Sequence, residues 1–90
     1  EVFKSSILSN AAGFLAFHCH PSGSPTPSRT DAVATQRLKE AGELLEIRMV
    51  DHLVVGCGSG RSFSFRGEGL FDGDVVKNYN RFKAEKEQER

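Results

Sequence analysis

The stretch Phe17–Asp31, FHCHPSGSPTPSRTD, joins the end of an apolar run to the start of a helix-like segment. His18 and His20 are separated by one residue, and alternate residues of a strand point to the same face. We therefore expect the two imidazoles to project together and Cys19 to point the other way. The proline-rich loop that follows cannot continue a regular ladder, so the strand ends here and a rigid connection begins.

A helix is predicted to start at Ser28. Ser28 and Asp31 have the spacing of a capping box, although Glu or Gln is the usual third-position partner. A carboxylate in the first turn also stabilises the helix dipole, which is a purely structural reason for Asp31. The alternative is chemical, because two histidines and one carboxylate are the ligands of an open zinc site. An isolated His-x-His pair is more often structural, so the residues alone leave both interpretations open.

The flanking segments predict the other elements. Residues 1–13 resemble an amphipathic helix, with one apolar face made of Phe3, Ile7, Leu8 and Ala11. Residues 14–19 have the pattern of a buried strand. The helix that starts at Ser28 is expected to bury the face made of Ala34, Leu38, Ala41 and Leu45.

The second half of the chain predicts a hairpin and a final helix. Residues 47–56, IRMVDHLVVG, are rich in β-branched residues, and a CGSG turn leads to a strand with Phe63 and Phe65 on one face. His52 is read as a hydrogen-bonded structural residue, since Asp51 points to the opposite face of the same strand. The order helix, strand, helix, strand, strand, helix indicates an α/β (α+β) domain with a mixed sheet flanked by helices.

Composition narrows the functional classes. Twelve Lys and Arg residues balance 12 Asp and Glu residues, which argues against direct nucleic-acid binding. Cys19 and Cys57 suggest no disulfide framework, so a reduced cytoplasmic setting is expected. No apolar run of about 18 residues is present to span a membrane. The chain begins at Glu1 rather than Met and is expected to be part of a longer protein, whose exposed sheet edge could pair in a homodimer.

Several blocks of sequence carry a family resemblance. His18-x-His20-Pro21, six residues, Ser28, two residues and Asp31 match the JAMM (MPN-type) metalloprotease motif at every spacing. The segments HPSGSPTPSRTD, TQRLKEAGELLEIRMVDHLVVG and SFRGEGLF closely resemble the RadC-like bacterial branch of that family. The resemblance extends from about Val2 to Phe71, which is most of the chain.

The resemblance implies a fold and an activity. It implies a cytidine-deaminase-like, MPN-type mixed sheet over residues 1–73, with upstream strands absent, followed by a polar helix or tail over 74–90. It further implies a zinc-dependent hydrolase of peptide or isopeptide bonds, acting on a protein or peptide substrate. Zinc would be bound by His18, His20 and Asp31, with water as the fourth ligand. Ser28 would hydrogen-bond the activated water or the oxyanion.

The sequence departs from the family pattern in two places. The general base should be a glutamate on a strand before Glu1, a segment that this sequence does not include. Cys19 replaces the asparagine that usually stands between the histidines, and is expected to be a small buried residue. Two alternatives therefore stay open, a DNA-repair-associated accessory protein and a metal-binding scaffold without catalysis.

Overall fold

Four strands form one mixed sheet in the computed structural model, which describes residues 5–88. The elements in chain order are β1 (Ser5–Asn10), β2 (Gly13–His20), α1 (Arg29–Leu44), β3 (Met49–Gly56), β4 (Ser62–Ser64) and α2 (Val75–Gln88). The sheet order is β1-β2-β3-β4. The outer pairs are antiparallel, whereas β2 and β3 are parallel and are joined by α1. This mixed architecture confirms the predicted fold class.

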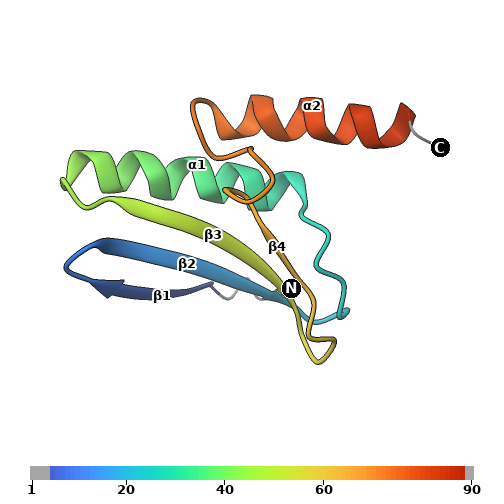
Figure 1. The fold of residues 1–90 in the computed structure, drawn as a ribbon, viewed down its shortest axis with the longest axis horizontal. Coiled ribbons are helices and arrows are strands. Elements are labelled where there is room, and N and C mark those ends of the chain that lie inside the picture. Colours follow the sequence, from blue (N-terminus) through green and yellow to red (C-terminus); the bar gives the residue numbers. More distant parts are fainter. Residues whose placement is uncertain (1–4, 89–90) are drawn as a thin grey trace.

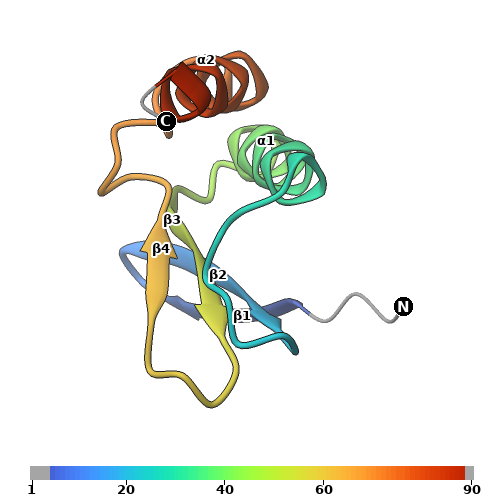
Figure 2. The ribbon, with the colours of Figure 1, turned by 90° about the vertical axis from the view of Figure 1, so that its right-hand side faces the viewer.

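Both helices lie on one side of the sheet, so that the described part of the chain has three layers: sheet, α1 and α2 (Figures 1 and 2). The core lies between β3 and the two helices. Its fully buried side chains include Val54, Phe65 and Val75. None of the helices in residues 5–88 is long and apolar enough to cross a membrane.

The predicted N-terminal helix is wrong where the structure describes it. Residues 5–10 form β1, which pairs antiparallel with β2, and the predicted helix residue Phe3 lies outside the described residues. The Asn10 side chain accepts a hydrogen bond from the Ala12 amide at 2.8 Å, and Gly13 follows with φ 142°. This tight turn favours a hairpin. Serines within the segment also compete with a helical backbone for hydrogen bonds.

The buried face of α1 also differs from the prediction. Asp31, Ala32, Thr35 and Gly42 are its buried residues, whereas Leu45 is 69% exposed. The helix approaches the sheet through small side chains, since a Cβ on Gly42 would lie 2.9 Å from the Phe14 ring and 2.5 Å from the Ile47 carbonyl oxygen. This close approach turns the expected apolar face partly toward solvent.

The strands at 14–19 and 47–56 and the hairpin to β4 are confirmed. Phe65 lies one residue beyond β4 and is fully buried, with its ring 5.3 Å from that of Phe63. The C-terminal helix is confirmed as α2. It is not merely a surface helix, because Val75 and Tyr79 are buried against the rest of the domain.

Candidate metal centre

The C-terminal end of β2 carries the two histidines. In the parallel pairing with β3, His18 is opposite Val54 and His20 is opposite Gly56. Gly56 lets the following loop approach β3 closely, since a Cβ there would lie 2.0 Å from the Gly23 carbonyl oxygen. The His20 carbonyl accepts hydrogen bonds from the Gly23 and Cys57 amides at 3.1 and 3.0 Å. The backbone around His20 is therefore held from two sides.

The capping box of α1 places Asp31. Ser28 is the N-cap, and its hydroxyl oxygen accepts a hydrogen bond from the Asp31 amide at 3.3 Å. In return the Asp31 carboxylate accepts from the Ser28 amide at 2.7 Å and from the Ser28 hydroxyl at 3.0 Å. The reciprocal bonds satisfy the helix end and fix the carboxylate in a fully buried position.

The loop and the capping box bring Asp31 against both histidines. Its Oδ1 lies 2.7 Å from His18 Nδ1, and its Oδ2 lies 3.2 Å from His20 Nε2. One potential ligand atom from each of the three residues lies within 4.8 Å of the others. The two imidazole rings meet edge to face, with centroids 4.8 Å apart. The structure thus gathers the predicted ligand set His18, His20 and Asp31 at one point.

The hydrogen bonds of His20 suit a cation. Its Nδ1 lies 3.2 Å from the Ser24 carbonyl oxygen, which can only accept, so Nδ1 carries a proton and donates it. Nε2 then faces Asp31 Oδ2 at 3.2 Å, where a metal ion could be held between the two atoms. Ligand atoms of a tetrahedral zinc are roughly 3.3 Å apart, which is close to the His20–Asp31 separation. The Ser24 contact is also the outer-shell bond that commonly orients a ligating histidine.

Asp31 is held in its ionised form. Burial raises the pKa of the carboxyl, but the hydrogen bonds from Ser28 and His18 outweigh burial and keep the pKa below its ordinary value of 3.8. A ligand that is already ionised at neutral pH binds a metal without first losing a proton.

A second layer of polar residues lies beneath Asp31. The Thr35 hydroxyl donates to the Asp31 carbonyl oxygen at 2.7 Å and also contacts His52 Nδ1. Because the single hydroxyl proton goes to Asp31, the His52 Nδ1 atom must be the donor in the second bond. Burial lowers the pKa of His52 below 6.5, and its ring stacks on Phe65. His52 is therefore buried and hydrogen-bonded through Nδ1, as predicted, whereas its buried Nε2 atom has no hydrogen-bond partner within the described residues.

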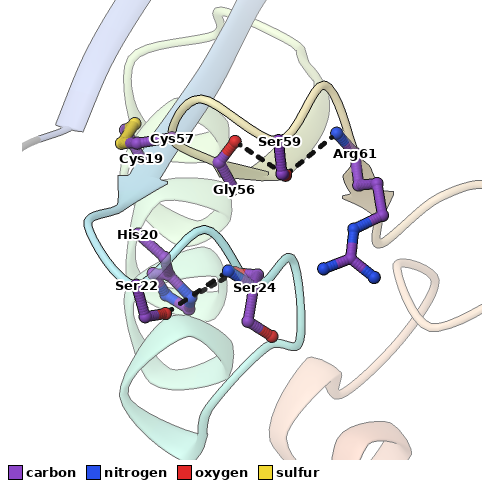
Figure 3. Close-up of a disulfide and its surroundings, with 8 residues drawn as sticks. All are labelled: Cys19, His20, Ser22, Ser24, Gly56, Cys57, Ser59 and Arg61. Atoms are coloured by element: carbon purple, nitrogen blue, oxygen red, sulfur yellow. Dashed lines mark hydrogen bonds between the residues drawn. A yellow bond between two sulfur atoms is a disulfide. The ribbon is translucent and has the colours of Figure 1, made fainter.

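The two cysteines correct the sequence-based prediction. Cys19 and Cys57 form a disulfide, with Cα atoms 5.6 Å apart. Cys57 directly follows β3, whose parallel register places its end beside Cys19, and this separation suits a disulfide. Cys19 was predicted to be a small buried residue, whereas it is half-buried and disulfide-bonded. As predicted, it points away from His20, and Figure 3 shows the disulfide on the opposite side of the strand end.

Sequence reasoning missed two supporting groups. Thr35 lies one helical turn beyond Asp31, and this i, i+4 spacing is a signal that could have identified it. The Ser24 carbonyl depends on the folded path of the loop, for which the sequence contains no comparable signal.

Comparison with known proteins identifies the family of this chain. The model of the RadC-like JAB domain family matches residues 1–70. The chain is similar to the UPF0758 protein of Thermotoga maritima, with 51% identity over 70 residues, 77% of this chain and 30% of the relative. It is also similar to UPF0758 proteins of Geotalea uraniireducens, with 49% identity over 74% of this chain and 29% of the relative, and of Caldanaerobacter subterraneus, with 46% identity over 80% and 30%. This chain belongs to the RadC-like JAB domain family. It spans about 30% of the length of these relatives.

Proposed function

We propose that this chain is the metal-binding domain of a zinc-dependent metallopeptidase or isopeptidase that acts on a protein or peptide substrate. The observation that carries the proposal is the convergence of His18, His20 and Asp31 within 4.8 Å. Two histidines and one carboxylate leave a coordination position open, as in catalytic rather than structural zinc sites. When bound, the ion would act as a Lewis acid and lower the pKa of a coordinated water toward about 7.

Ser28 is proposed to serve the reaction directly. Its hydroxyl now donates to the Asp31 carboxylate at 3.0 Å, and the residue is exposed at the mouth of the cluster. With a metal ion held by Asp31, the Ser28 hydroxyl would instead donate a hydrogen bond to a substrate carbonyl oxygen. A hydrogen bond of this kind stabilises the charge that develops on that oxygen during attack.

The general base is proposed to come from outside the cluster. Within residues 5–88, the gathered ligand set contains Asp31 as its single carboxylate, and β1, whose sequence is SSILSN, contributes no acidic residue. In the family pattern this base is a glutamate on a strand that precedes the histidines. A second candidate function is a metal-binding scaffold without catalysis. It is favoured by the presence of only one carboxylate, Asp31, in the ligand set gathered within residues 5–88.

Hydrolysis assays separate these two candidates. The chain, and a chimera that adds the segment flanking the matched region of the Thermotoga maritima relative, are loaded with zinc and given peptide and isopeptide substrates. The proposal predicts that the chimera cleaves a substrate and that its Ser28→Ala variant loses most of that activity while keeping its zinc. Zinc-loaded chimera that cleaves none of the substrates would favour the scaffold.

A cytoplasmic setting is also proposed, as the sequence suggested. Mass spectrometry of the protein isolated from its host under acid quenching tests it. Cys19 and Cys57 are bonded to each other in the structure, but the proposal expects them to be reduced in the cytoplasm. A disulfide that is stable there would contradict the proposal, because cytoplasmic thiols are normally kept reduced.

A further inference from the structure

A groove of about 420 Å³ lies beside Ser28, between the start of α1 and the C-terminal part of α2. We call it the α2 groove. One wall is the loop and helix start from Thr26 to Arg29. The other wall consists of five α2 side chains, Tyr79, Phe82, Lys83, Lys86 and Glu87. Their spacing of three and four residues places them on one face of the helix.

α2 is attached to the loop that carries Ser28. Tyr79 is buried, and its hydroxyl donates to the Pro27 carbonyl oxygen at 3.4 Å. α2 runs antiparallel to α1, and its C-terminal end extends past the first turn of α1 (Figure 1). It begins at Val75, beyond the residues 1–70 that match the family. The groove therefore combines residues of the matched region with a helix outside it.

The groove has an aromatic floor and a positive rim. Phe82 is half-buried, and the Lys86 Nζ atom lies 5.5 Å from the centre of its ring. The charged lining residues are Arg29, Lys83 and Lys86 against a single carboxylate, Glu87. A ligand that fits this lining presents an apolar group to the ring and negative charge to the rim.

We propose that the α2 groove binds an acidic peptide segment of the protein substrate. An apolar side chain of the segment would pack on Phe82, and its carboxylates would pair with Arg29 and Lys83. Ser28 both lines the groove and hydrogen-bonds Asp31, so the groove adjoins the His-His-Asp cluster through Ser28. The inference deepens the proposed peptidase function and rests on it for the identity of the ligand.

The test is an NMR titration of the metal-free chain with a short peptide of alternating glutamate and leucine. Amide shifts are expected at Ser28, Arg29 and along the Tyr79–Glu87 face. An Arg29→Glu, Lys83→Glu double variant should weaken binding by roughly tenfold, as expected for two reversed charges at an exposed site. The matched control, Lys77→Glu with Arg81→Glu, makes the same charge change on α2 outside the groove lining and should leave the affinity within about twofold.

Each of three results would overturn the inference. The first is equal binding of a lysine–leucine peptide, the second is an equal loss of affinity in the two double variants, and the third is amide shifts confined to other surfaces. Tighter binding of a single-stranded oligodeoxynucleotide at the same amides would reassign the groove to nucleic acid. Zinc content is measured in parallel. A chain that binds zinc but not the acidic peptide refutes the groove alone, whereas one that binds the peptide but no zinc refutes the proposed metallopeptidase.

Discussion

Asp31→Asn tests how much of the domain's stability depends on the buried carboxylate. The side chain accepts hydrogen bonds from the Ser28 amide, the Ser28 hydroxyl and His18, with no exposed surface. Hydrogen bonds to a charged group contribute about 1.5–3 kcal/mol, against about 0.5–1.5 for neutral pairs. Asparagine keeps the shape but loses the charge. We therefore expect the free energy of unfolding of the metal-free protein to fall by about 2 kcal/mol at pH 7.

The pH dependence of this difference gives a second check. The pKa of Asp31 in the folded protein lies below its ordinary value of 3.8, so the carboxylate stabilises the fold above pH 3.8. This contribution is lost as the pH falls through the folded-state pKa. The gap between wild type and Asp31→Asn should be constant near neutral pH and should shrink in acid.

Urea unfolding followed by circular dichroism, with EDTA present, measures both effects. Asp72→Asn is the matched control, because Asp72 is exposed and should change stability by less than about 0.5 kcal/mol. Equal stability of wild type and Asp31→Asn at pH 7, or a gap that persists unchanged in acid, would refute the reasoning.

Three further predictions concern residues that support the site. Gly56→Ala should destabilise the domain by about 1–3 kcal/mol in urea unfolding, because its Cβ would collide with the Gly23 carbonyl oxygen; a loss below about 0.5 kcal/mol would contradict this. Phe65→Ala should cost about 3–5 kcal/mol by the same assay, since the ring is fully buried against His52; a loss below about 1 kcal/mol would contradict it. The folded-state pKa of His52 lies below 6.5, so stability should decline as the pH falls below 6.5, and His52→Gln should reduce that slope; an unchanged slope would contradict the assignment.

Local signals in the sequence predicted the parts of the site that lie close together along the chain. The alternation of His18 and His20 and the spacing of Ser28 and Asp31 depend on a strand and a helix start, which short stretches encode. The structure places all four residues accordingly. Their chemical roles remain predictions.

The sequence-based predictions were wrong where tertiary contacts determine the local structure. Residues 5–10 have a helical apolar pattern, yet pairing with the free edge of β2 makes them a strand. Gly42 allows α1 to lie so close to Phe14 that the helix buries small residues rather than Leu45. The Cys19–Cys57 bond depends on the register of β2 against β3, which no local pattern reports.

Zinc binding measured by mass spectrometry tests the central claim most directly. The chain is loaded with zinc and freed of unbound metal by gel filtration, and its zinc content is compared with that of variants. We predict about one zinc per wild-type chain, loss of zinc in His20→Ala and Asp31→Ala, and full retention in His52→Gln and in a Cys19→Ser, Cys57→Ser double variant. A wild-type chain that retains no zinc, or a His20→Ala variant that keeps the wild-type content, would contradict the account.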